Sequence, residues 1–133
     1  MDDSNRAVEL VVPTTPEFGG VVRIAAVGLA SLAGLDIDKT EDLRLAADEM
    51  WIYLRSLDPA IESVAFRFTF APGVVHTQAR APWKKPEVPT PTPDNLGWVV
   101  LTAITTGAAC TVSAGHVVVS ADVANNDAVH PSR

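Results

Sequence analysis

Two side chains in the middle of the chain are spaced to share one chemical site. Glu49 and Tyr53 are four residues apart, so a helix would present both on the same face. A glutamate carboxylate that lines a substrate pocket can act as a general base. A tyrosine beside it would hold a metal poorly, because a neutral phenol with a pKa of about 10 is a weak ligand. The pair therefore indicates either a working site or the remains of one.

The other reactive side chains do not form a recognisable site. His76, His116 and His130 have no metal-ligand spacing to one another or to Cys110, so we expect no metal site. Cys110 lies in a segment expected to be a strand and should pack as a small core residue. The sequence also contains no Ser-His-Asp arrangement and no glycine loop of the Walker type.

Composition and charge limit the class of protein. The length of 133 residues suits one domain, and a hydrophobic content of 47% is typical of a globular chain. The net charge of −6 argues against nucleic acid or an anionic membrane as a direct partner. No apolar run reaches the ~20 residues of a membrane span, and the acidic first residues do not resemble an export signal. Together with the single cysteine, these features predict a cytoplasmic protein.

Hydrophobic periodicity and turn residues divide the chain into strands and helices. The expected elements, in chain order, are a strand at 7–12, a helix from 16 or 17 to about 33, a helix from 40 to before 58, strands at 64–70 and 74–79, a helix at about 94–106, and strands at 108–114 and 116–123. We expect Gly34 to end the first helix and Thr40 to cap the second. The proline-rich segment 82–93 should form a stiff, exposed loop.

This order of elements predicts an α/β two-layer sandwich. Neighbouring strands joined by short turns form hairpins, which favour a mostly antiparallel sheet with the helices on one face. We expect the domain to comprise residues 7–123, with a disordered N-terminus at 1–6 and a flexible tail at 124–133.

Three stretches carry a resemblance to a known family. They are Val22–Gly28 with the following Ala33-Gly34, then Glu41–Glu49, and then Leu96–Leu101, and the middle one is the most specific. They resemble the anti-sigma factor serine kinases of bacterial stress and sporulation switches, most closely the actinobacterial type. That family belongs to the histidine kinase-like ATPase superfamily, so the resemblance implies the Bergerat fold over roughly residues 7–123.

The resemblance also implies an ATP site that has lost several of its parts. An intact member has Glu-x-x-x-Asn on the nucleotide-binding helix, where the glutamate is the base and the asparagine binds Mg²⁺; here the pair is Glu49 and Tyr53. Arg80 falls about where an aspartate should accept the adenine amino group, and a guanidinium has no acceptor. At the end of the ATP lid, a Gly-x-Gly motif reads Asn95-Leu96-Gly97. We therefore expect no cofactor, with ATP and Mg²⁺ as the alternative, and Tyr53 to fill the former pocket.

The resemblance suggests three functions. The first is an anti-sigma factor that sequesters a stress-type sigma factor and is released by an anti-anti-sigma protein. Arg23 matches an arginine on the family's sigma-binding helix, and the acidic residues 36–42 could steer a basic partner. The second is an active serine kinase acting on the anti-anti-sigma protein with Glu49 as base, and the third is a scaffold for another regulator. Family members often pair, so a homodimer is expected.

Overall fold

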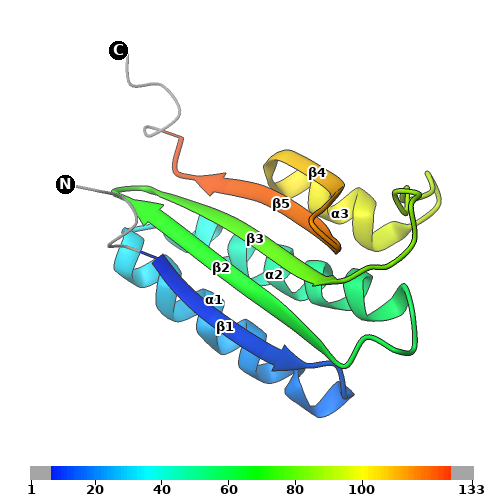
Figure 1. Cartoon of the computed structure of the whole chain (residues 1–133). Coiled ribbons are helices and arrows are strands. Elements are labelled where there is room, and N and C mark those ends of the chain that lie inside the picture. The colour runs from blue at the N-terminus through cyan, green and yellow to red at the C-terminus, as the bar shows by residue number, and fades with distance from the viewer. Residues whose placement is uncertain (1–6, 127–133) are drawn as a thin grey trace.

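The computed structural model describes residues 7–126, and the predicted disordered N-terminus, most of the predicted tail and His130 lie outside them. The elements, in chain order, are β1 (Ala7–Pro13), a short 3₁₀ turn at Pro16–Phe18, α1 (Gly19–Ala33), α2 (Ile37–Ser56), β2 (Ser63–Ala71), β3 (Val74–Pro82), α3 (Leu96–Ile104), β4 (Thr106–Ser113) and β5 (His116–Ala124). The predicted order of strands and helices is therefore confirmed (Figure 1).

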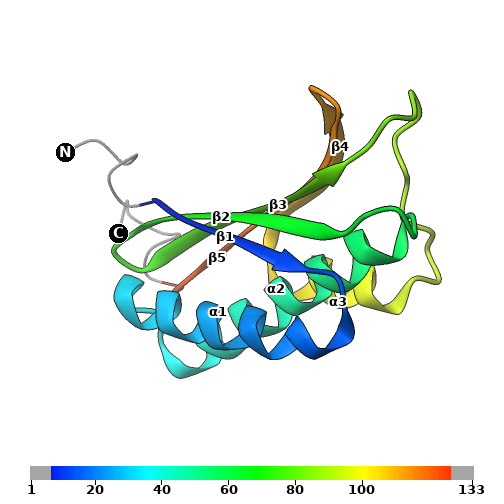
Figure 2. The ribbon, with the colours of Figure 1, turned by 60° about the horizontal axis from the view of Figure 1, so that its bottom comes forward.

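The strands form one antiparallel sheet in the order β1-β2-β3-β5-β4. The last strand, β5, is inserted between β3 and β4, so β4 lies at the edge of the sheet. Figure 2 shows α1, α2 and α3 together on one side of the sheet, with the other side open. This arrangement is the predicted α/β two-layer sandwich.

The core lies between the sheet and the helices. Along β2 and β3, every second residue is buried, and these inward side chains include Phe66, Phe68 and Ala79. The helices bury residues at helical spacing, such as Val22 and Ala26 of α1 against the sheet. Only every second residue of a strand and every third or fourth residue of a helix point inward. These are therefore the side chains that can reach a site between the layers.

The helix ends agree with the sequence at one position and differ at another. Gly34 ends α1 with a left-handed φ of 75°, as expected of a terminating glycine. The prediction that Thr40 caps α2 is wrong, because the helix begins earlier, at Ile37. Asp36 has an extended backbone, and its carboxylate accepts a 2.8 Å hydrogen bond from the Lys39 amide. Thr40 lies inside the first turn of the helix.

One end of the sheet is joined to the α1–α2 connection by Asn125. Its side-chain amide donates to the Gly34 carbonyl at 2.9 Å, and its side-chain oxygen accepts from the Asp36 amide at 2.9 Å. Its backbone amide donates to the Gly73 carbonyl in the β2–β3 turn at 2.8 Å. These contacts, which we call the Asn125 clasp, extend the packed domain beyond residue 123, where the sequence predicted its end.

The first helix is unusually apolar on both sides. Pro16–Ala33 is, within residues 7–126, the one helical stretch whose length and hydropathy would also suit a membrane span. Its inner side packs against the sheet through Val22 and Ala26, while Val21, Ile24 and Leu32 are exposed. Apolar residues exposed on a packed helix often mark a surface that another molecule covers.

Candidate functional site

Glu49 and Tyr53 lie on one face of α2, and both meet the start of α3. The Tyr53 ring is 5.7 Å from the Trp98 ring, measured between centroids, with the planes tilted by 47°. The Glu49 carboxylate lies directly against Gly97, so close that a side-chain carbon added to this glycine would collide with it. The spacing of the pair therefore brings both side chains to the α2–α3 junction.

Tyr53 is sealed beneath the proline-rich segment. Its hydroxyl donates a 3.0 Å hydrogen bond to the Pro89 carbonyl, and only 9% of the residue is exposed. The Cys110 thiol of β4 donates to the same carbonyl at 3.4 Å. Burial, more than the neighbouring Cys110, raises the pKa of Tyr53 above its ordinary value, so the phenol stays neutral. We call these contacts of Tyr53, Pro89 and Cys110 the Tyr53 latch.

Glu49 is partly buried and lies near another negative charge, that of Asp48. Burial, and secondly the negative charge of Asp48, raise the pKa of its carboxyl group above the ordinary value. Within residues 7–126 its side chain has no hydrogen-bond partner, although it lies at the first turn of α3, where a helix favours negative charge. A carboxyl group with a raised pKa can serve as a base or simply as a helix-end charge.

Asn95 has a structural role at the same junction. Its side-chain oxygen accepts a 3.0 Å hydrogen bond from the Trp98 amide, so Asn95 is the N-cap of α3. Gly97 follows in the first turn, where the absence of a side chain leaves room for Glu49. Four of the predicted site residues, namely Glu49, Tyr53, Asn95 and Gly97, are therefore neighbours in space.

Arg80 is not part of this group. On β3 the buried residues Ala79 and Ala81 face the helices, while Arg80 is exposed on the open face of the sheet. There it lines a hollow of about 170 Å³ together with residues that include Arg67 and Gln78. Arg80 therefore does not lie with the other predicted site residues. The helix-facing alanines also have no side-chain acceptor, so the expected loss of the aspartate is unchanged.

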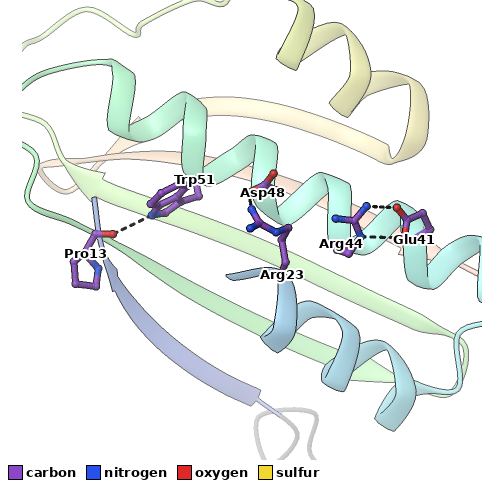
Figure 3. A network of polar contacts seen from close by, with 6 residues as sticks. All are labelled: Pro13, Arg23, Glu41, Arg44, Asp48 and Trp51. Carbon is purple, nitrogen blue, oxygen red and sulfur yellow. Dashed lines mark hydrogen bonds and ion pairs between the residues drawn. The ribbon is translucent and has the colours of Figure 1, made fainter. Parts of the chain in front are cut away.

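Arg23 links the first helix to this site through one residue. Its guanidinium is 3.2 Å from the Asp48 carboxylate of α2, and 42% of its side chain is exposed (Figure 3). Asp48 is the residue whose charge raises the pKa of Glu49. Trp51, one turn further along α2, is buried and donates from its indole nitrogen to the Pro13 carbonyl at 3.2 Å.

The acidic run before and within α2 is partly neutralised by its own helix. Asp42 is 3.5 Å from the Lys39 ammonium. Glu41 pairs with Arg44, as Figure 3 shows. The bond to Arg44 lowers the pKa of Glu41. Two of the four predicted steering charges are therefore neutralised within α2, whereas Asp36 and Asp38 have no cationic partner in residues 7–126.

The donor set at the junction suits Mg²⁺ poorly. Mg²⁺ prefers several hard oxygen ligands in octahedral geometry, and Tyr53 offers a neutral phenol whose proton is bonded to Pro89. Across residues 7–126, no three His, Cys, Asp or Glu side chains gather as metal ligands would. The contacts of Trp98, Pro89 and Cys110 with Tyr53 were not predicted, because no sequence spacing links a loop carbonyl to a distant helix.

Comparisons with known proteins give partial sequence matches to one kind of protein. No family model matches the chain. The chain is similar to the serine-protein kinase RsbW of Bacillus subtilis, with 40% identity over 42 residues that make up 32% of this chain and 26% of RsbW. A similar match to RsbW of Bacillus velezensis has 39% identity over 49 residues, or 37% and 31% of the two chains. The aligned regions thus span less than a third of these relatives.

A solved structure extends the likeness to the whole fold. The crystal structure of the RsbU and RsbW domains of Rv1364c from Mycobacterium tuberculosis matches with a TM-score of 0.69 over 89% of this chain and 32% of the other. The sequence identity is 14%, so this match concerns the fold. It agrees with the five-stranded antiparallel sheet and its helical layer.

Proposed function

We propose that the protein works by binding. The premise, which these matches support, is that it belongs to the anti-sigma factor serine kinase family. It sequesters a stress-type sigma factor and releases it when an anti-anti-sigma protein competes for an overlapping surface. In this proposal the former ATP site no longer binds nucleotide, so ATP does not control the exchange of the sigma factor for the anti-anti-sigma protein. The matches to RsbW support a role in partner switching; the choice between binding and catalysis depends on the site.

The Tyr53 latch is the observation that carries this proposal. The side chain at the expected Mg²⁺-binding position is buried, neutral and bonded to the segment that would have to move as an ATP lid. Its ring also packs on Trp98 at the start of α3, where a lid would end. Opening this segment for a nucleotide would expose an aromatic ring and break the bond to Pro89.

The partner surface that we propose is the exposed side of α1 together with Arg23. This side presents Val21, Ile24 and Leu32 to solvent, and Arg23 is the one charged residue of the helix. Apolar area with a single cation suits a protein partner, because burial supplies affinity and the charge selects orientation. Arg23 is held by Asp48, so a partner that engages the guanidinium must compete with that ion pair.

Nucleotide binding is the direct test of the lost ATP site. We expect isothermal titration with Mg·ATP at millimolar concentration to show no binding, and thermal unfolding to be unchanged. Binding at 100 times Kd would stabilise the protein by about 2.7 kcal/mol, which a thermal shift would detect. A saturable heat of binding, or a shift of that size, would overturn this part of the proposal.

Recovery of the partner tests the anti-sigma role itself. Tagged protein should retain a sigma factor, and the anti-anti-sigma protein should displace it without added nucleotide. Arg23→Glu should weaken retention, while Arg67→Glu on the open sheet face serves as a charge-matched control. Retention of a different regulator with consistent absence of any sigma factor would favour a scaffold instead.

Glu49 supports a second candidate, an active serine kinase. A carboxyl group whose pKa is raised above the ordinary value is a stronger base than an ordinary glutamate. If this function holds, the protein should transfer phosphate from ATP to a serine of the anti-anti-sigma protein. Glu49→Gln would then abolish the transfer and leave binding of the anti-anti-sigma protein intact.

A further inference from the structure

A second surface lies at the corner where α1 meets the start of α2, away from the Arg23–Asp48 pair. A hollow of about 580 Å³ is lined there by apolar residues of both helices and of their connection, among them Val27, Leu35 and Ile37. Leu35 forms its buried floor, while Ile37 is 89% exposed at the first position of α2. The corner therefore combines a concave site with an aliphatic side chain that contributes almost nothing to the core.

Charge accompanies this apolar hollow. Asp38 and Glu41 line it together with Ser31 and Thr40. Asp38 has no cationic partner within residues 7–126, and Glu41 keeps half of its side chain exposed, at 54%, despite its pairing with Arg44. An apolar floor with carboxylates at the rim is complementary to an aliphatic side chain flanked by lysine or arginine.

The charges also argue against other occupants. Anionic lipid headgroups would be repelled by Asp38 and Glu41, so the apolar character of α1 does not make this corner a membrane site. A second copy docked by two-fold symmetry would place the same carboxylates opposite one another, in a chain whose net charge is −6. A partner of opposite charge fits both features.

We propose that this corner is a docking site for a basic amphipathic helix of a partner protein. One apolar side chain of that helix enters between Val27 and Ile37, and lysine or arginine residues beside it pair with Asp38 and Glu41. This is recognition of a helix in a groove, with charge fixing the orientation. The site includes neither Arg23 nor Glu49, but it uses Asp38 and Glu41 of the acidic run considered for steering a sigma factor, so it deepens the proposed function. The peptide test below requires no sigma factor, so the two proposals can fail separately.

A model peptide provides the probe. The full chain is titrated into a fluorescein-labelled helical peptide of leucine and lysine, with the leucines on one face, and anisotropy is followed. A peptide with glutamate in place of lysine is the control. We expect the lysine peptide to bind and the glutamate peptide not to bind. In NMR titrations of the labelled protein, the amide shifts should centre on Ser31, Ile37 and Thr40.

Variants of exposed residues test the two components separately without disturbing the core. Ile37→Ser should weaken binding of the lysine peptide at least about fivefold, which corresponds to about 1 kcal/mol. Asp38→Lys should weaken it by at least as much and reduce its salt dependence. Val11→Ser, at an aliphatic residue that is 66% exposed on β1, is the matched control and should leave affinity unchanged.

Three results would overturn the proposal. The first is equal affinity of the wild type and both corner variants, and the second is equal binding of the two peptides. The third is a dimer in sedimentation equilibrium that Ile37→Ser dissociates, because the corner would then be a contact between copies of this chain.

Discussion

Tyr53 illustrates how one substitution changes the chemistry of an entire site. An asparagine at this position would offer a carbonyl oxygen to a metal, whereas the phenol donates its proton to Pro89 and packs its ring on Trp98. The same residue thus removes a metal ligand and supplies buried aromatic area to the α2–α3 junction. A single substitution therefore both removes the metal ligand and adds packing at the junction.

Two substitutions of Tyr53 separate these contributions. Tyr53→Phe removes only the hydroxyl and should lower the free energy of unfolding by about 1 kcal/mol, the usual value of one hydrogen bond. Tyr53→Ala also removes the ring and should lower it by about 3 kcal/mol. Urea unfolding followed by tryptophan fluorescence measures both. Equal, small losses for the two variants would mean that the ring does not fill the junction.

Glu49 should make stability depend on pH in a predictable direction. Its pKa is higher in the folded protein than in the unfolded chain, so the folded state binds the proton more tightly. Stability from this group is present below the unfolded pKa of about 4.3 and is lost as the pH rises through the folded pKa. Glu49→Gln should therefore become more stable relative to the wild type as the pH rises from about 4.3 through the folded pKa. Urea midpoints across that range would show the opposite trend if the α3 dipole outweighs burial.

At this scale the sequence predicted partners on one helix better than residues on a strand. The spacing of Glu49 and Tyr53 was sufficient to place them together, because residues four apart lie on the same face of a helix. Arg80 was predicted to belong to the same site, but it lies on the open face of the sheet, because successive residues of a strand point to opposite faces. The Tyr53 latch could not be predicted, since it depends on where a loop carbonyl lies in space.

At the scale of elements, the helix termini are where the structure adds most to the sequence. Asp36 is the N-cap of α2 in place of the predicted Thr40, although both residue types are common caps. The decision depends on backbone conformation, and Asp36 has the extended dihedral angles that a cap requires, with φ −70° and ψ 175°. The periodicity of the helix interior gave no information about this choice.

The two candidate caps can be compared directly. Asp36→Ala should lower the free energy of unfolding by about 1 kcal/mol, because the Lys39 amide loses its acceptor. Thr40→Ala should change it by less than about 0.5 kcal/mol, because its hydroxyl makes one long bond of 3.4 Å to the Leu35 carbonyl. Chemical denaturation of the pair is sufficient, and a larger effect at Thr40 would contradict the assigned cap.

Two glycines in helices should respond differently to alanine. Gly28→Ala should stabilise α1 by about 0.5–1 kcal/mol, because the added carbon meets no atom within 4 Å. Gly97→Ala should gain less, because the new carbon must displace the Glu49 carboxylate. A double-mutant cycle checks this contact: in a Glu49→Ala background, the Gly97 substitution should become more favourable. An unchanged effect would mean that the two residues do not touch.

The whole molecule is held together by contacts between distant parts of the chain. The Asn125 clasp joins the end of β5 to the α1–α2 connection and to the β2–β3 turn. The strand order, with β5 inserted beside β3, makes such contacts possible. The sequence predicted the sandwich because each element shows its own periodicity, but a polar residue in an expected tail carried no signal for its distant partners.

Removing the clasp should therefore affect the entire domain. Asn125→Ala should lower the free energy of unfolding by about 1–2 kcal/mol, because it removes two side-chain hydrogen bonds. Asn126→Ala is the control and should stay within about 0.5 kcal/mol. Differential scanning calorimetry of both variants would contradict the clasp if they unfold at the same temperature.

The position of β5 has a consequence for the order in which the protein can form during synthesis. Strand β4 is made first but pairs only with β5, so it has no neighbour in the sheet until residues 116–124 have left the ribosome. The earlier part, β1 to β3 with α1 and α2, can pack as it emerges. The hydrogen bonds of Gly34 and Asp36, between α1 and α2, form only after Asn125 has been synthesised. A ribosome stalled before residue 116 would therefore hold a partly closed domain, with one edge of β3 and the whole of β4 unpaired and open to other chains.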